Sequence, residues 1–280
     1  MAEKETSIKQ ILIALDASPS SMSALENAVE LASRMNAELV GLFVEDINLL
    51  RATQFPFARE ISVFSTGFRR LEFSDLERQL RAQANRVRRI MEQITRGKNV
   101  PTHFRVARGV VAEEILDASK DADLLIIGKI GRSFPGFRGS GSTVRRIVVK
   151  RPGMTLIWHM QGYMARPVVV AYDGSESARK AIDVAVNLHR TQDGGIIVFI
   201  VAGNREDVPM LRREASEELK KKGESAAFRA MVRPGLVNLS HMLQREMAGP
   251  VVIPCDPELI TGERLCSLID EIPNPVLLVK

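Results

Sequence analysis

The chain has 280 residues, of which 45% are hydrophobic and 26% charged, a composition typical of a globular protein long enough for two domains. Its net charge of +5 is concentrated in residues 69–98, where basic and apolar residues alternate at helical spacing, which favours a solvated helix face over a nucleic-acid site. Cys255 and Cys266 lack metal-binding spacing, no apolar run reaches the roughly 20 residues of a membrane span, and the first residues lack a signal-peptide pattern. We therefore expect a cytoplasmic protein without a zinc site, a membrane partner or a nucleic-acid partner.

The first half of the chain alternates predicted strands and helices. Residues 11–15 (ILIAL) form a continuous apolar run, as expected of a strand buried on both faces, and Ser18 followed by Pro19 is typical of a helix start. The later strands are predicted at 38–44, 102–107, 123–128 and 154–158, and the later helices at 73–94, 111–119 and 142–149. This alternation predicts a doubly wound parallel sheet, in which ligands bind beyond the carboxyl ends of the strands.

Residues 46–72 interrupt this pattern with an apolar, aromatic and basic stretch. A loop of this length without structure is unusual, so we expect a partly helical flap or an interface element. A lid packed on its own domain and a site for a partner remain open alternatives.

The sequence repeats itself. Residues 11–33 align with 168–190, so that Asp16 is equivalent to Asp173, and near the ends of the halves Pro152 is equivalent to Pro273. Two α/β domains in tandem are therefore predicted, at 1–160 and 166–280, each with a five-stranded parallel sheet of the Rossmann-like type.

The segment that points to chemistry is GKIGRSFPGFRGSGST, at residues 128–143 between a strand and a helix. Its glycines allow a ligand to approach the backbone, and the amides at the start of the helix favour a phosphate. The neighbouring cations Lys129, Arg132, Arg138 and Arg145 can neutralise phosphate charge. The segment is neither a Walker A loop nor the glycine fingerprint of a dinucleotide-binding domain.

The order G-x2-G-x9-G-S, together with Asp16 after the first strand and Val44 at the end of the second, resembles the ATP-binding pattern of the universal stress protein family. The resemblance implies that ATP is the ligand, accompanied by Mg²⁺. It places Asp16 beside the nucleoside, the Val44 backbone against adenine, and the glycine-rich segment around the ribose and phosphates. The residues assigned to nucleotide binding are Leu15, Asp16, Val44, Gly128, Gly131, Arg132, Gly141, Ser142 and Thr143. A helix-capping role for Asp16 and a core role for Val44 remain alternatives.

The second half departs from this pattern. Pro254 replaces the first glycine, the loop is shorter, and Glu263 follows Gly262 where Ser142 follows Gly141, so that a carboxylate there would repel phosphate. We therefore predict one functional site, in the first half, and a second half that stabilises or dimerises the first.

Three functions are compatible with these features. The favoured one is an ATP-dependent regulatory protein of the stress response with at most weak hydrolysis, because phosphate donors are present without an obvious general base. An ATPase or phosphotransferase using Asp16 and Arg132 or Arg138, and a nucleotide-independent dimerisation scaffold, are the alternatives.

The final strands of both halves, 154–158 and 275–279, are apolar, and in this family each sits at a sheet edge. Exposed apolar edges invite pairing, so the two halves are predicted to pair as a pseudo-twofold unit joined by the short linker 159–166. A homodimer of chains is a further alternative.

Overall fold

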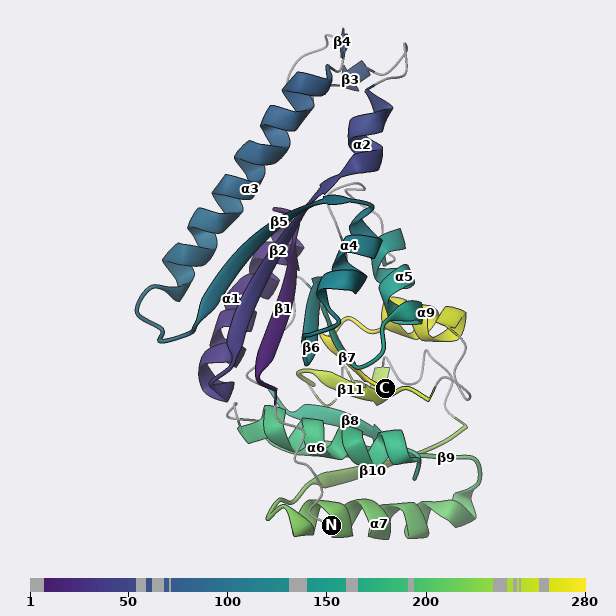
Figure 1. Ribbon diagram of the computed structural model, residues 1–280. Helices are drawn as coiled ribbons and strands as arrows, with labels where there is room; N and C mark the ends of the chain where they lie inside the picture. Colours follow the sequence, from purple (N-terminus) through teal and green to yellow (C-terminus); the bar gives the residue numbers. More distant parts are fainter. Residues whose placement is uncertain are drawn as a thin grey trace.

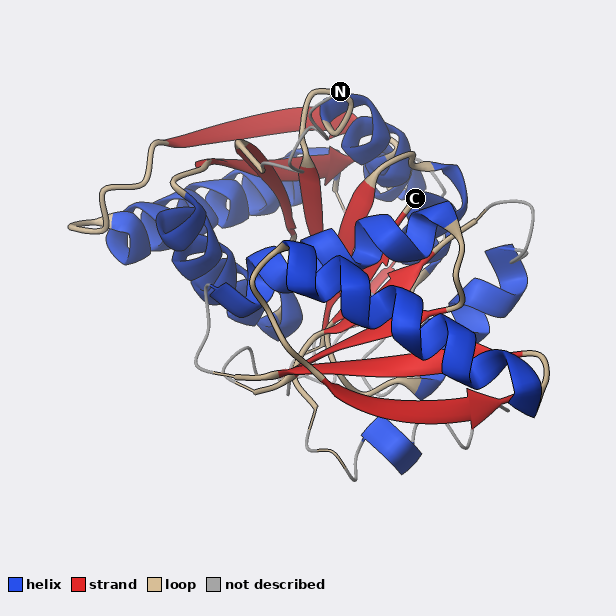
Figure 2. Ribbon diagram, turned by 90° about the horizontal axis from the view of Figure 1, so that it is seen from below, coloured by secondary structure: helices blue, strands red, loops and turns tan. Residues whose placement is uncertain are grey.

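One sheet runs through the molecule and is covered by helices on both faces (Figures 1 and 2). The structure is a computed structural model, and the residues it describes are 8–53, 59–61, 68–70, 72–130, 140–159, 166–190, 194–233, 241–243, 246, 248–256 and 262–280.

Ten strands form the main sheet, in the order β10-β9-β8-β11-β12-β7-β6-β1-β2-β5. The first half contributes β1 (Gln10–Leu15), β2 (Glu38–Asp46), β5 (Thr102–Gly109), β6 (Leu124–Gly128) and β7 (Met154–Trp158). The second half contributes β8 (Val168–Tyr172), β9 (Ile196–Ala202), β10 (Ala227–Val232), β11 (Val251–Pro254) and β12 (Val276–Val279). All pairs within a half are parallel, so the predicted doubly wound architecture is confirmed in both.

The helices divide into two layers. One face of the sheet packs against α1 (Pro19–Met35), α3 (Phe73–Thr95), α6 (Glu176–Arg190) and α7 (Val208–Lys221), which follows the short 3-10 helix η1 (Arg205–Asp207). The other face packs against α4 (Val111–Ala118), α5 (Ser142–Lys150) and α9 (Gly262–Glu271). Each layer combines helices from both halves over a continuous core, because the sheet beneath it is continuous.

Local sequence signals account for most of these boundaries. Ser18 is the N-cap of α1, and its side chain accepts a hydrogen bond from the Ser21 amide while Pro19 occupies the first turn, as predicted. The strand expected from residue 123 begins instead at Leu124, because the Asp123 carboxylate accepts hydrogen bonds from the amides of Lys9 and Gln10.

The segment 46–72 is partly helical, as expected. It contains α2 (Ile47–Ala52) and the short antiparallel pair β3 (Arg59–Ile61) and β4 (Phe68–Arg70), which forms a separate sheet. Leu50 of α2 packs with Leu76 and Leu80 of α3, so this helix covers its own half. Figure 1 places α2, β3 and β4 at the end of the molecule away from β8, β9 and β10 of the second half.

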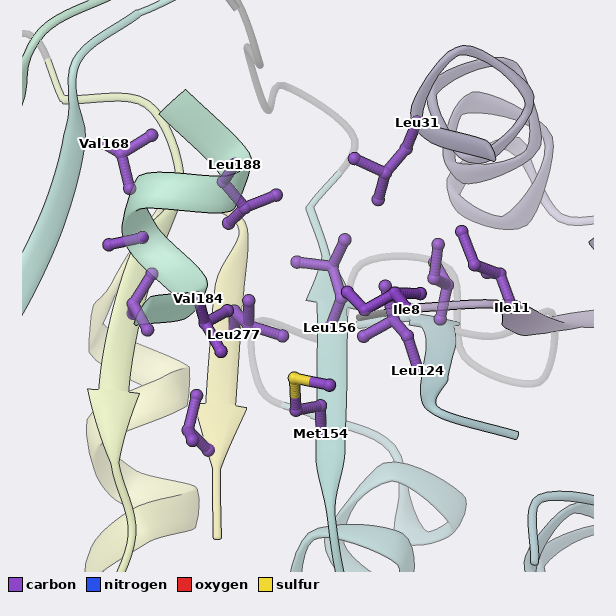
Figure 3. Close-up of a cluster of buried hydrophobic side chains, with 14 of the residues drawn as sticks. Ile8, Ile11, Leu31, Leu124, Met154, Leu156, Val168, Val184, Leu188 and Leu277 are labelled. Carbon is purple, nitrogen blue, oxygen red and sulfur yellow. The ribbon is translucent and has the colours of Figure 1, made fainter. Parts of the chain in front are cut away.

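The two halves meet where β7 and β12 pair in an antiparallel manner. The register opposes Leu156 to Leu277, and these residues are equivalent in the repeat because they share the offset that relates Pro152 to Pro273. A residue that pairs with its own equivalent lies on a twofold axis, so the halves are related by a pseudo-twofold through this point. Apolar side chains from both halves pack around it, among them Leu31, Leu188, Leu156 and Leu277 (Figure 3).

Candidate functional site

Three adjacent strand ends bring the predicted nucleoside-binding residues to one edge of the sheet. In the order β6-β1-β2, Leu15 pairs with Phe43, and Ile13 pairs with Ile126 two residues before the last residue of each strand. Leu15 and Gly128 therefore end neighbouring strands at the same level, with Val44 beside them on β2. The chain moves outward in one direction from β1 to β2 and later returns on the other side of β1, so this edge is a topological switch point.

The turn after β1 holds Asp16. Its Oδ1 accepts a hydrogen bond from the Ser18 amide at 2.9 Å, and its own amide donates to Ser21 Oγ. Because Ser18 provides the N-cap of α1, the alternative that Asp16 is the helix cap is wrong. Its carboxylate instead closes a short turn, in which Ala17 adopts a left-handed backbone with φ of 60°.

Gly128 lets the start of α1 approach the end of β6. A Cβ atom at this position would lie 2.9 Å from Ser20 Oγ and 3.3 Å from the Ser21 amide nitrogen. Ser20 Oγ in turn donates to the Trp158 carbonyl at 3.4 Å. Packing within the protein therefore favours glycine at position 128, whether or not a ligand also approaches it.

Gly141 is different, because the space that a side chain would fill is open. It is the N-cap of α5, it has an ordinary extended backbone with φ of −65°, and no described atom lies within 4 Å of a Cβ placed there. No side chain caps the helix at this end in the described part of the chain, while Ser142 is exposed and Thr143 half-buried. Unpaired amides and the helix dipole make such an end favourable for an anion.

Gly131, Arg132 and Arg138 lie outside the described residues. The arrangement therefore brings together Leu15, Asp16, Val44 and Gly128 at the strand ends. Gly141, Ser142 and Thr143 lie at the start of the helix that packs on the same half.

Two of the cations expected to neutralise phosphate are engaged elsewhere. Lys129 is buried, and its ammonium donates to the carbonyl oxygens of Asp270 and Ile272 at 3.1 and 3.2 Å. Arg145 donates to the carboxylate of Asp270 at 2.5 Å. For Lys129 the expectation was wrong, because sequence proximity to the loop did not reveal that its side chain reaches into the second half.

Burial also changes the pKa of two side chains in this region. Removal from water lowers the pKa of Lys129, although the negative charges of Asp270 and Glu271 oppose the effect. Burial lowers the pKa of His159 as well, and the nearby ammonium of Lys129 acts in the same direction. The ammonium of Lys129 is thus a buried cation held by helix carbonyls.

The equivalent position in the second half is closed. A Cβ on Gly262 would lie 2.6 Å from Val149 Cγ2, so the start of α9 packs against α5 across the boundary between the halves. Pro254 continues β11 and pairs with Val279, and Glu263 places a negative charge in the first turn of α9. Asp173 keeps the turn geometry of its counterpart, accepting from the Ser175 amide at 3.0 Å.

These features define an α/β protein whose first half has a topological switch point at the carboxyl ends of β6, β1 and β2. A family model described as the universal stress protein family matches residues 7–158 and again residues 164–253. The chain therefore belongs to the universal stress protein family, with the family domain present twice. No curated protein matches the sequence.

Solved structures of similar fold cover nearly the whole chain. A universal stress protein from Archaeoglobus fulgidus DSM 4304 superposes with a TM-score of 0.72 at 18% identity, covering 97% of this chain and 96% of that one. A putative universal stress protein from Pseudomonas aeruginosa UCBPP-PA14 gives 0.62 at 15% identity, covering 99% and 94%. The cytoplasmic domain of a prokaryotic cation chloride cotransporter gives 0.57 at 10% identity, covering 97% and 95%. At these identities the similarity establishes the fold.

No helix in the described residues is long and apolar enough to cross a membrane.

Sequence reasoning missed one residue near the site. Asp270 belongs to the second half, and its carboxylate accepts hydrogen bonds from the Ser140 amide and from Arg145 of the first half. Its equivalent in the first half is Val149, so the repeat gave no signal for a polar residue here.

Proposed function

We propose that this protein binds ATP, as its magnesium complex, at a single site in the first half and acts as a nucleotide-dependent regulatory protein. The adenosine would lie along the carboxyl ends of β1 and β2, beside Asp16 and the Val44 backbone. The phosphates would lie at the start of α5, where the amides of Ser142 and Thr143 can donate to them.

The contrast between two equivalent glycines carries this proposal. Among the residues that the structure describes, Gly141 has open space around it and no side chain caps the helix that follows. Gly262, in contrast, faces Val149 and is followed by Glu263. An open and uncapped helix start supports phosphate binding in the first half, and the closed, acidic counterpart argues against a second site.

The direct test is to extract and identify the nucleotide from freshly purified protein by mass spectrometry, and then to titrate the emptied protein with ATP and Mg²⁺ by calorimetry. We expect one molecule of ATP per chain. Two equivalent sites, or no binding of any adenine nucleotide, would contradict the proposal.

The variant Gly141→Asp places a carboxylate where the phosphates are expected. Because a hydrogen bond to a charged group contributes about 1.5–3 kcal/mol, the affinity for ATP should fall roughly tenfold to hundredfold. The matched control is Gly203→Asp, which adds the same charge at an equally open glycine after β9 in the second half. An unchanged affinity in folded Gly141→Asp protein would refute the phosphate site.

A further inference from the structure

Both ends of the glycine-rich loop are attached to the same turn of the second half. Lys129, at the start of the loop, donates through its ammonium to the carbonyl oxygens of Asp270 and Ile272. Ser140, at its end, donates its backbone amide to Asp270 Oδ1 at 2.6 Å. Residue 270 thus receives one bond from each end, through its backbone and its side chain.

A third donor completes the attachment. Arg145, in the second turn of α5, donates to Asp270 Oδ2 and also reaches the Ser140 carbonyl at 3.3 Å. Both oxygens of the carboxylate are therefore engaged by the residues that lead into the helix. The carboxylate of Asp270 is paired with the guanidinium of Arg145, which offsets its negative charge beside the helix start.

A lysine of the second half makes a similar contact with the first half, but this contact does not involve the glycine-rich loop. Lys280 follows β12 and donates to the carbonyl oxygens of Val148 and Arg151 at 2.6 and 2.8 Å, at the end of α5. A lysine from each half thus holds the last carbonyls of the other half's helix, which would otherwise lack partners. On this side the residue equivalent to Asp270 is Val149, which faces Gly262 and brings no charge to the boundary.

We propose that Asp270 and Lys129 are positioning residues for the nucleotide site, so that the second half fixes both ends of the phosphate loop. This proposal rests on the ATP site proposed above. A loop whose ends are held in place loses less conformational freedom when it binds a ligand, and such preorganisation increases affinity. The second half would then contribute to nucleotide binding without holding a nucleotide, and nucleotide occupancy would be sensed at the boundary between the halves.

The test compares three variants of the full chain. Asp270→Ala and Lys129→Met each remove one attachment of the loop, and Lys280→Met removes the corresponding lysine across the same boundary without touching the loop. For each, the measurements are the ATP affinity by calorimetry, the hydrogen exchange of peptides covering residues 129–145, and the midpoint of unfolding. Asp270→Asn, which keeps an oxygen for the Ser140 amide and loses the ion pair, is the milder variant should Asp270→Ala fail to fold.

We expect Asp270→Ala and Lys129→Met to speed exchange in residues 129–145 and to lower the affinity for ATP by up to about tenfold, because binding must then order the loop. Lys280→Met should change neither. An affinity that is unchanged or higher in Asp270→Ala, as expected if the carboxylate competes with phosphate for Arg145, would overturn the proposal. So would an equal loss in Lys280→Met.

The exchange measurement separates this proposal from the ATP site. If the wild-type protein bound no nucleotide, the function proposed above would fail, yet faster exchange in Asp270→Ala alone would still establish that the second half anchors the loop. Unchanged exchange in both loop variants would refute the anchoring itself.

Discussion

The turn after the first strand of each half requires a left-handed residue, and the two halves meet the requirement differently. Ala17 adopts φ of 60° in the first half, whereas the equivalent Gly174 adopts 85° in the second. An L-residue pays an energetic cost in this region that glycine does not. The conserved feature of the turn is thus its shape, held in both halves by an aspartate that accepts from the serine amide two residues later.

The two helix-start glycines should respond oppositely to the same substitution. Gly262→Ser introduces a Cβ that would lie 2.6 Å from Val149 Cγ2, and because Val149 is exposed, the free energy of unfolding should fall by about 1 kcal/mol, the low end of the range for overpacking. Gly141→Ser meets open space and adds a favourable N-cap side chain, so stability should stay the same or rise by a few tenths of a kcal/mol, about the difference between Gly and Ser at that position.

Chemical denaturation of both variants checks this prediction, and Val149→Ala provides the rescue. The double variant Gly262→Ser with Val149→Ala should recover most of the lost stability, because the clashing methyl group is gone. Equal stability of the two serine variants would show that the start of α9 can move away from Val149.

At the scale of elements, one ion-pair network joins β2, β5 and α3 beside the proposed adenine site. Arg108 of β5 donates to the buried carboxylate of Glu45, the residue after Val44, at 2.8 Å. It also donates to Glu77 of α3 at 2.7 Å. A buried carboxylate needs a partner, so Arg108 fixes the strand end against the helix.

This network predicts a particular dependence of stability on pH. The hydrogen bond from Arg108 holds the pKa of Glu77 below its ordinary value of 4.5. A group whose pKa is lowered by folding contributes stability above its unfolded pKa, and that contribution is lost as the pH falls through the folded value. The wild-type protein should therefore lose stability as the pH falls below 4.5, and Arg108→Met should flatten this acid slope.

Unfolding of wild type, Arg108→Met and Glu77→Gln at several pH values between neutrality and acid tests the prediction. At neutral pH Arg108→Met should be the less stable variant, because it leaves Glu45 buried without its partner. Glu77→Gln, which leaves the pair of Arg108 with Glu45 intact, should be affected less. Identical acid slopes in all three proteins would contradict the assignment.

At the scale of the whole molecule, the halves share a sheet and cores. The strands β7 and β12 pair in an antiparallel manner at the centre of the sheet, and all five residues of β7 and all four of β12 are buried. Helices of both halves contribute to each of the two large buried clusters. Separation of the halves would expose an apolar strand edge together with the core around Leu156 and Leu277.

Expression of residues 1–160 alone tests this dependence. We expect the fragment to bind a hydrophobic dye or to associate through β7, since an exposed apolar edge strand seeks another strand. Analytical ultracentrifugation and dye binding measure both effects against the full chain. A stable monomer with no exposed apolar surface and full affinity for ATP would show that the second half is dispensable.

The spacing of apolar residues and the residues typical of helix starts were enough to predict most helices and strands of this protein. The long helix was expected at 73–94 and is found at Phe73–Thr95, because its buried residues recur at helical spacing. The repeat likewise predicted two parallel five-stranded sheets, since equivalent strands carry equivalent apolar runs, and in the structure these join through β7 and β12 into one ten-stranded sheet. The position of Leu15, Asp16, Val44 and Gly128 at one edge followed from the rule that parallel strands end together.

The sequence by itself thus determined the secondary structure, the tandem repeat of two α/β halves and the position of the glycine-rich loop. These features depend on residues that are neighbours along the chain or that recur in the repeat. Only the tertiary structure decided that Lys129 faces the second half, that Asp270 receives both ends of the loop, and that Val149 closes the start of α9. These contacts join residues more than a hundred positions apart, and the pseudo-twofold brings them together without any mark in the local pattern. Their physical basis is the pairing of β7 with β12, which sets α5 against α9 and thereby selects which side chains meet.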